Sequence, residues 1–230
     1  MSDYLRAPEH LKNDVPPALA IGLSLVSHDP KQLHVALIYR TEGGEHNLIH
    51  LGWHHQLRHE PWNNEYHWVG VQGIDEEVQE TFADWAIIVS TKACEHPIPY
   101  SIIFSPDRTF DTSGQFISGT DGRGLTCATF LLALFSDFSI PIADRETWPA
   151  GREVDVAWAD RILKALEDYL EKRFPDYRPQ WLLQHEQRRM LRRYRPEEVA
   201  ACGHHYRGTP VHFDVASRSG ADFCRKLRSV

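Results

Sequence analysis

Two runs of strand-forming residues joined by a tight glycine loop constrain the fold of this chain most. Leu33 to Arg40 (LHVALIYR) and Asn47 to Gly52 (NLIHLG) flank the loop Glu42-Gly43-Gly44-Glu45. This arrangement is typical of a β-hairpin. The buried-looking run Ala18 to Val26 precedes the hairpin, and Tyr66 to Val71 reads as a further strand after a connection rich in Trp, His and Asn. The pattern predicts an antiparallel sheet.

Helical patterns dominate the rest of the chain. Apolar residues recur at helical spacing in four segments, which are Ile74–Thr91, Leu125–Phe138, Val154–Phe174 and Gln180–Tyr194. Tyr100–Phe104 is expected to form a short strand, and Val211–Val215 is the strand candidate of the C-terminal stretch. Strands followed by helices indicate the α+β class, with helices packed on an antiparallel sheet. We expect an N-terminal arm at 1–17, a catalytic domain at 18–145, and a helical C-terminal extension at 146–230 packed on the core.

Charge and hydropathy exclude several classes of protein. The net charge is −7, which argues against nucleic acid as a partner. No apolar run reaches the ~18 residues needed to span a bilayer. The N-terminus does not resemble a signal peptide, so we expect a cytoplasmic protein. Residues 178–230 are basic, with 11 Lys and Arg against five Asp and Glu. Their arginines Arg188, Arg189, Arg192 and Arg193 are expected to face the acidic N-terminal body or to bind a protein partner.

Four cysteines occur in the chain, and one has the setting of a nucleophile. Cys94, Cys127, Cys202 and Cys224 are scattered, which suits neither a disulfide framework nor a zinc ribbon. Cys127 follows Thr126, a good N-cap residue, and begins an apolar helix. Free N–H groups and the helix dipole at such a position lower the pKa of a thiol. The preceding glycine-rich segment, which includes Gly124, would let a substrate backbone approach closely.

Two histidines on the hairpin can supply the base that thiol chemistry requires. His34 lies near the start of the first strand and His50 near the end of the returning strand, so the two imidazoles are expected to be cross-strand neighbours. One would act as the base, and the other would fix its tautomer and orientation. A nucleophile, a base and an orienting group form a catalytic triad.

These residues resemble a known group of enzymes. The order LHVALIYR, LIHL and then LTCATF is similar to the permuted papain-fold superfamily, in particular its lecithin:retinol acyltransferase-like and NlpC-related bacterial branches. His34, His50, Cys127 and Phe130 match the positions of the base, the second polar residue, the nucleophile and a following Phe. The family's Asn before the cysteine is Thr126 here, and the tail after Asp144 has no counterpart. The resemblance implies a papain-like core and an acyl-enzyme mechanism.

We therefore expect a thiol hydrolase (an amidase or peptidase) or an acyltransferase with a Cys127–His34–His50 triad. The substrate would be a peptide, another amide or an acyl compound, and no cofactor is implied. We expect Tyr100, Thr126, Gly124 and Trp53 to form the oxyanion site or the substrate cleft. The histidine-rich stretch from His50 to His67 is interpreted as a lid or cleft wall in preference to a metal site. The alternative is a non-catalytic protein that presents its basic C-terminal helix to a partner.

Overall fold

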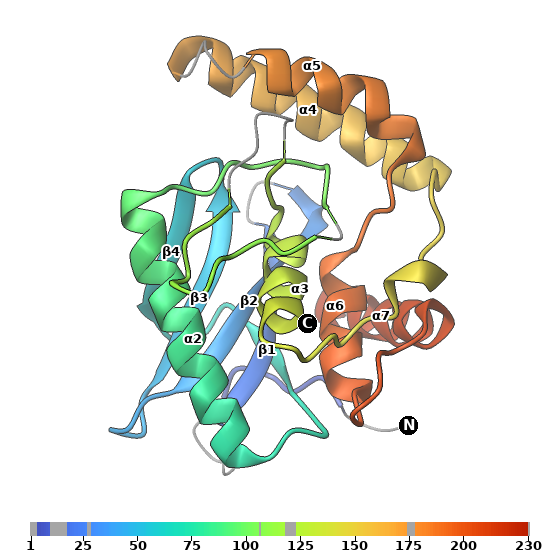
Figure 1. The fold of residues 1–230 in the computed structure, drawn as a ribbon. Coiled ribbons are helices and arrows are strands. Elements are labelled where there is room, and N and C mark those ends of the chain that lie inside the picture. The colour runs from blue at the N-terminus through green and yellow to red at the C-terminus, as the bar shows by residue number, and fades with distance from the viewer. Residues whose placement is uncertain are drawn as a thin grey trace.

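A five-stranded antiparallel sheet forms the centre of the computed structural model, which describes residues 4–9, 18–26, 29–105, 107–117, 123–173 and 178–229. The strands are β1 (Leu19–Val26), β2 (Asp29–Arg40), β3 (His46–Trp53), β4 (Gln56–Pro61) and β5 (His67–Gly70). Their order across the sheet is β4-β3-β2-β1-β5 (Figure 1). The first four strands are therefore an up-and-down meander, and β5 closes the other edge by pairing with β1.

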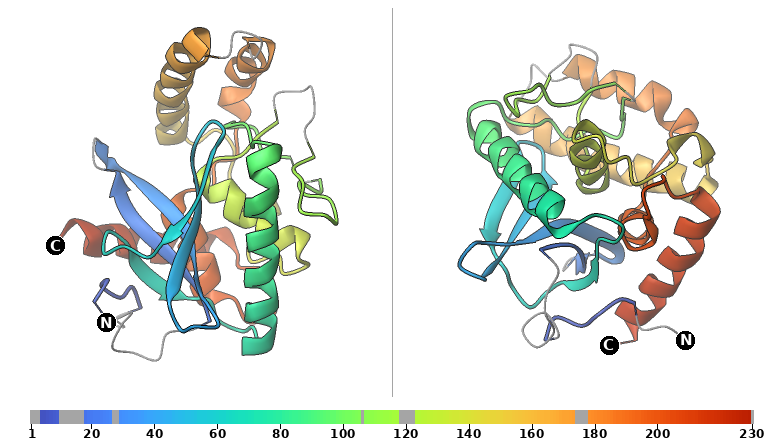
Figure 2. Two further views of the ribbon diagram at one scale, coloured as in Figure 1. Left: turned by 90° about the vertical axis from the view of Figure 1, so that its left-hand side faces the viewer. Right: turned by 60° about the horizontal axis from the view of Figure 1, so that its bottom comes forward.

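Six α-helices lie within the described residues. They are α2 (Glu76–Glu95), α3 (Cys127–Asp137), α4 (Glu153–Arg173), α5 (Arg178–Gln187), α6 (Pro196–His205) and α7 (Phe213–Arg228). The helices α2, α3 and α6 contact the sheet, on the face that looks toward the viewer in Figure 1. In contrast, α4 and α5 pack on each other beyond one end of the sheet, as the left view of Figure 2 also shows.

The two faces of the sheet bury different groups because side chains alternate along each strand. Leu33, Val35 and Leu37 of β2 belong to the main core, together with residues of α2, α3, α6 and α7. Ala36 and Ile38 belong to a smaller cluster on the other face, with Tyr66 and Trp68. Helix α3 is hydrophobic nearly all round, and nine of its 11 residues are buried. It is therefore a central helix that packs on the sheet and also on α6.

One core joins the predicted catalytic region to the C-terminal extension. The main cluster combines residues of the sheet with Val199 and Cys202 of α6 and Phe223 of α7. A second cluster holds α4 together with Tyr100 and Ile102. Of the predicted arm, residues 1–3 and 10–17 lie outside the described residues, whereas Arg6 forms an isolated bridge with Trp68. None of the helices in the described ranges carries an apolar stretch long enough to cross a membrane.

The predicted α+β class is confirmed, but three elements differ from the predictions. Strand β4 lies in the stretch interpreted as a connection, because it is a polar edge strand with one apolar residue, Leu57. The predicted helix Gln180–Tyr194 is shorter, since α5 ends at Gln187 and a 3-10 turn, Arg188–Met190, follows. The prediction that Val211–Val215 forms a strand is wrong.

Helix α7 takes the place of that strand. Val211 makes only an isolated bridge with Ala143, and the helix begins at Phe213. The imidazole of His212 caps it by accepting from the backbone N–H of Asp214 (3.2 Å). The apolar face of the helix, with Phe223 and Leu227, then recurs with helical spacing over the following turns. The expected strand Tyr100–Phe104 is likewise limited to one bridge, between Tyr100 and Leu125.

Candidate functional site

Cys127 is the first residue of α3, and the prediction that Thr126 caps this helix is confirmed. The hydroxyl of Thr126 accepts from the backbone N–H of Thr129 (3.2 Å), and the hydroxyl of Thr129 accepts from the N–H of Thr126 (2.7 Å). This reciprocal pair is a capping box. It satisfies two donors but involves neither the N–H of Cys127 nor that of Ala128. Those two amides therefore remain directed at the start of the helix, where anionic groups are stabilised.

The environment of the Cys127 thiol has opposing effects on its pKa. Burial raises the pKa, and this is the largest effect. The backbone amides of Val35, Ala128 and Cys127 itself face the sulfur and lower the pKa, as does the charge of Arg193. The net direction is upward, so the prediction of a lowered pKa is wrong for this state of the protein. The helix terminus acts as expected, but the removal of the thiol from water outweighs it.

The two predicted histidines meet, and a carboxylate extends the pair. Nε2 of His34 lies 2.7 Å from Nδ1 of His50, and Nε2 of His50 lies 3.2 Å from Oε1 of Glu60. The three side chains come from β2, β3 and β4, respectively. Sequence reasoning missed Glu60 because β4 was not predicted. The feature that could have revealed Glu60 is the register of the hairpin formed by β3 and β4, which pairs Glu60 with Leu48. Leu48 and His50 lie on the same face of β3, so Glu60 lies on the face of His50.

This chain of three groups fixes the tautomers of both imidazoles. Burial lowers the pKa of His50 and lowers that of His34 to about 3, so both rings are neutral near pH 7. A neutral imidazole carries a single N–H. When His50 donates from Nε2 to Glu60, its Nδ1 must accept from Nε2–H of His34. The lone pair of Nδ1 of His34 is then the basic end of the chain.

The thiol and the imidazole chain approach the same part of β2 from its two faces. Cys127 shares the main core with Leu33 and Val35. His34 alternates with these residues, and its ring packs edge-on against His50 and Tyr66, with ring centres 4.8 and 6.3 Å away. Among the described residues, no hydrogen bond joins Sγ of Cys127 to either imidazole. The structure therefore pairs the predicted base with its orienting group, but it does not pair the base with the nucleophile.

The sheet is interrupted at this position. The ladder between β2 and β3 runs from Arg40–His46 to Leu37–Ile49 and then stops, although both strands continue. His34 and His50 lie beyond the last pair, so their side-chain hydrogen bond spans the part where the backbones are no longer paired. The backbone N–H of Val35, in the same stretch of β2, faces the sulfur of Cys127.

Two tyrosines complete the surroundings of the thiol. Tyr100 is fully buried and packs on Trp53, with ring centres 4.5 Å apart. Burial raises the pKa of Tyr100, and it raises that of Tyr66 to about 12. The negative charge that Cys127 can carry contributes to both increases, so both phenols lie within electrostatic range of the sulfur. Sequence reasoning identified Tyr100 and Trp53 but missed Tyr66, which the pairing of β5 with β1 brings onto the sheet.

Gly124 allows two backbone segments to approach each other closely in this structure. A Cβ at this position would lie 2.3 Å from the carbonyl oxygen of Pro99 and 2.8 Å from Cβ of Ser101. This close approach allows the N–H of Leu125 to donate to Pro99 (2.9 Å) and the N–H of Ser101 to donate to Leu125 (3.2 Å). The glycine thus permits the segment before α3 to pair with the segment around Tyr100. Residues 118–122 of the predicted glycine-rich loop lie outside the described residues.

The histidines between β3 and β5 each contact a different part of the structure. Nδ1 of His54 accepts from the backbone N–H of Tyr100 (3.2 Å), and Nε2 of His59 lies 2.6 Å from the hydroxyl of Tyr39. His55 has a positive φ of 59° in the turn between β3 and β4. Within the part of the chain that the structure describes, no three His, Cys, Asp or Glu side chains are grouped so that they could hold a metal ion.

The sequence predicts that four arginines face a protein partner or the acidic N-terminal body. Three of these arginines pair with carboxylates of residues 146–160. Arg188 binds Asp160 (2.7 Å), Arg192 approaches Glu146 (3.4 Å), and Arg193 binds Asp155 (3.1 Å). Their charges therefore hold the 188–193 segment against α4 and the turn before it.

Comparison of the chain with protein-family models, with curated protein sequences and with solved structures gave no match. The resemblance to permuted papain-fold enzymes consequently rests on His34, His50, Cys127 and Phe130 alone.

Proposed function

We propose that the protein is a cysteine-dependent hydrolase or acyltransferase with a permuted papain-like core. The observation that carries this proposal is the chain Glu60–His50–His34, which ends at the stretch of β2 whose Val35 amide faces the sulfur of Cys127. A carboxylate that orients one imidazole, which orients a second, is the arrangement expected of a general base that is held in one tautomer. The thiol meanwhile lies at a capped helix start, where amides can stabilise negative charge.

In the proposed mechanism, Nδ1 of His34 takes the proton of the Cys127 thiol. The sulfur then attacks a carbonyl carbon, and the imidazolium returns the proton to the leaving amine or alcohol as the C–N or C–O bond breaks. The first-turn amides of α3 and the hydroxyl of Tyr100 are candidates to stabilise the oxyanion. Water or a second acceptor then releases the acyl group. The proton transfer requires His34 to turn toward the thiol across the part where β2 and β3 are unpaired.

Amides are the preferred substrate class under this proposal, in peptides, isopeptides or peptidoglycan-type crosslinks, and lipid esters come second. The alternative is a non-catalytic protein that uses the same scaffold for binding. Two observations favour that alternative: burial raises the pKa of Cys127, and the described residues include no hydrogen bond between its sulfur and an imidazole. A test must therefore measure the reactivity of the thiol itself.

Alkylation by iodoacetamide distinguishes the two functions if Cys94 is removed first. Cys94 is exposed and reacts because it is accessible, so a Cys94→Ser background is needed. In this background we expect Cys127 to be labelled before Cys202, which is fully buried, and before Cys224, whose pKa burial raises to about 12. Adding His34→Gln should slow the labelling of Cys127 at least tenfold, since a base contributes roughly 10²–10⁴-fold to a reaction.

His185→Gln is the matched control, because His185 lies on α5 and is not part of the chain of Glu60, His50 and His34. It should leave the labelling rate unchanged. Labelling of Cys202 or Cys224 ahead of Cys127, or equal rates with and without His34, would favour the non-catalytic alternative.

A further inference from the structure

The helices α4 and α5 form a hairpin that is set apart from the rest of the molecule. They pack on each other and on the 3-10 turn Arg188–Met190, and neither packs extensively on a strand of the described sheet. The apolar side chains of α4 belong to a separate hydrophobic cluster, whereas α2, α3, α6 and α7 contribute to the main core. The left view of Figure 2 shows the hairpin beyond the end of the sheet. We call the α4–α5 hairpin the cap.

The cap contacts the rest of the molecule through a narrow strip of residues. Tyr100 and Ile102 are buried in the same cluster as the apolar residues of α4. The backbone N–H of Ile102 donates to Oε1 of Gln184 on α5 (3.0 Å), and the side-chain amide of Gln56 donates to the hydroxyl of Tyr169 on α4 (3.5 Å). Because this contact is small, separating the cap should require less free energy than unfolding the whole protein.

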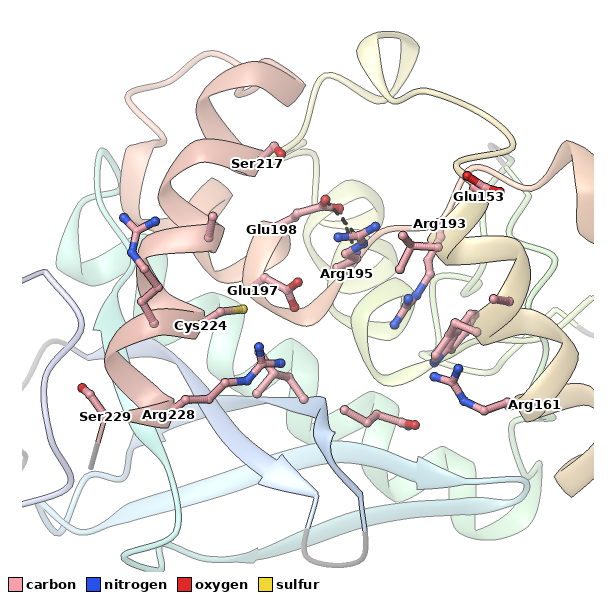
Figure 3. A pocket seen from close by; sticks show the side chains of 17 residues that line it. Glu153, Arg161, Arg193, Arg195, Glu197, Glu198, Ser217, Cys224, Arg228 and Ser229 are labelled. Carbon is pink, nitrogen blue, oxygen red and sulfur yellow. Dashed lines mark hydrogen bonds and ion pairs between the residues drawn. The ribbon is translucent and has the colours of Figure 1, made fainter.

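Two open cavities border the cap. One, of about 980 Å³, separates the first half of α4 from α7 and from the start of β2 (Figure 3). The other, of about 330 Å³, lies between residues 102–104 and the segment that follows α5. These spaces leave room for the cap to tilt relative to the sheet.

The two connections that lead into and out of the cap are joined at its base. The backbone N–H of Gly151, before α4, donates to the carbonyl of Leu191, after α5 (3.0 Å). Gly151 has a positive φ of 65°, and a Cβ there would lie 2.8 Å from the carbonyl oxygen of Arg189. A glycine is therefore required where the two connections cross.

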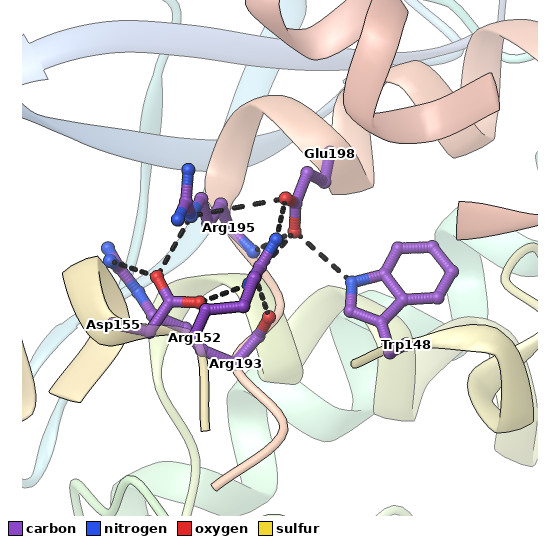
Figure 4. A network of polar contacts seen from close by, with 6 residues as sticks. All are labelled: Trp148, Arg152, Asp155, Arg193, Arg195 and Glu198. Atoms are coloured by element: carbon purple, nitrogen blue, oxygen red, sulfur yellow. Dashed lines mark hydrogen bonds and ion pairs between the residues drawn. The ribbon is translucent and has the colours of Figure 1, made fainter. Parts of the chain in front are cut away.

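A buried ion network ties the same base to α6 (Figure 4). Asp155, in the first turn of α4, accepts from Arg193 (3.1 Å) and Arg195 (2.9 Å) of the second connection. Arg152 binds both Asp155 and Glu198 of α6. The side chains of the two carboxylates are only 2% and 3% exposed. Because breaking a buried ion pair is strongly unfavourable, the base stays fixed when the rest of the cap moves.

The strip under the cap adjoins the start of α3. Tyr100 is 5% exposed, and the N–H of the next residue, Ser101, donates to the carbonyl of Leu125 (3.2 Å). Leu125 lies two residues before Cys127, which is itself only 9% exposed. The structure therefore describes a closed state, in which a carbonyl substrate has no access to the thiol.

We propose that the cap rotates about the ion network at its base and that a substrate reaches Cys127 between the cap and residues 100–103. Opening breaks the hydrogen bond between Gln184 and Ile102 and leaves the contacts of Asp155 intact. Hinged elements gate many enzyme sites in this way. That the cap admits a substrate rests on the proposed function, whereas its rotation does not. Cys127 is labelled only in the open fraction, so its labelling rate reports the opening equilibrium.

Gln184→Ala tests the proposal in the full chain with Cys94→Ser. The substitution leaves the buried N–H of Ile102 without its acceptor when the cap is closed, whereas water satisfies this group when the cap is open. The open fraction should rise, and the rate at which iodoacetamide labels Cys127 should increase about tenfold, as expected for one lost buried hydrogen bond. Mass spectrometry of the labelled peptide measures this rate.

Gln79→Ala is the matched control. Gln79 lies on α2 and likewise accepts from a buried backbone N–H, that of Leu19 (2.9 Å), in the main core. It also donates to the carbonyl of Ile74 (2.8 Å), so its removal is at least as disruptive. This control should lower the melting temperature without accelerating the labelling of Cys127. Equal acceleration by both substitutions, or none by Gln184→Ala, overturns the proposal.

Hydrogen exchange of the unmodified chain provides a second measurement. The amides of α4 and α5 should exchange together and faster than those of β1 and β2, and equal protection of the cap and the sheet overturns the proposal. The labelling data also separate the cap from the catalytic function. Acceleration by Gln184→Ala without any effect of His34→Gln supports the cap and contradicts the proposed enzyme. The reverse result overturns the cap and leaves the proposed enzyme in place.

Discussion

At the scale of single residues, Asp155 carries the most consequential charge in the C-terminal half. Its buried carboxylate is shared by Arg152, Arg193 and Arg195. Asp155→Asn removes the charge and leaves three arginines with Glu198 alone. Because uncompensated buried charges are strongly unfavourable, we expect the free energy of unfolding to fall by about 3–5 kcal/mol. Urea denaturation of both proteins measures this difference.

Asp160→Asn provides the control for that substitution. Asp160 also lies on α4 and also binds an arginine, Arg188, but its side chain is 53% exposed. Exposed ion pairs contribute only about 0–1 kcal/mol. The decrease in the free energy of unfolding should therefore be several-fold larger for Asp155→Asn than for Asp160→Asn. Similar decreases would contradict the argument that the burial of Asp155 makes its charge important.

The depressed pKa of His34 predicts a loss of stability in acid. The folded protein protonates His34 only near pH 3, whereas the unfolded chain does so near pH 6.5. Between these values the unfolded state binds more protons, so the free energy of unfolding falls as the pH drops below 6.5. One such histidine accounts for up to about 1.4 kcal/mol per pH unit. His54 and His204, whose pKa values burial lowers to about 3 and about 4, act in the same range.

Urea titrations at pH 7.0, 5.5 and 4.5 test this prediction. His34→Gln should show a smaller loss of stability between pH 7.0 and 4.5 than the wild type, because the variant lacks one of the groups that the unfolded state protonates. Identical losses in both proteins would mean that His34 is not held neutral in the fold.

At the scale of elements, the segment before α3 depends on the absence of a side chain at Gly124. A Cβ there would meet the backbone of Pro99. This backbone is held by the hydrogen bond that the carbonyl of Pro99 accepts from the N–H of Leu125, so it cannot move without breaking that bond. We expect Gly124→Ala to lower the free energy of unfolding by about 1–3 kcal/mol, as for other overpacked sites. Gly43→Ala, where the nearest atom would be 3.7 Å away, should have little effect. Thermal unfolding followed by circular dichroism compares the two, and equal melting temperatures would contradict the steric argument.

Elements with strong periodicity could be predicted from the sequence, and polar or interrupted ones could not. The helices α3 and α4 were expected to within about two residues, because their apolar residues recur regularly. Strand β4 has a polar pattern because it forms the edge of the sheet, so local sequence did not distinguish it from a loop. The same omission concealed Glu60, whose contact with His50 depends on strand pairing. Neither the burial of Cys127 nor its side of the sheet can be read from a local motif.

At the scale of the whole molecule, α6 and α7 are structural parts of the main core. Val199 and Cys202 of α6 and Phe223 of α7 pack with residues of the sheet and α3. A chain truncated at residue 177 should therefore expose the core face of β1 and lose cooperative unfolding, because much of the apolar burial is removed. Differential scanning calorimetry would detect this as the loss of a single sharp transition. An unchanged melting temperature would show that the first 177 residues fold independently.

The packing of α6 on β1 also affects how fast the protein reaches its native state. Gly203 lies so close to Ile21 that a Cβ would be 2.6 Å from its Cδ1, although 181 residues separate the two in the chain. Contacts between such distant segments form slowly, because a long loop must close before any of them is gained. Until these contacts form, one apolar face of the sheet remains exposed to solvent and can associate with other chains. Refolding should consequently pass through a collapsed intermediate that binds apolar dyes and aggregates at high concentration, and chaperones that shield exposed strands should increase its yield.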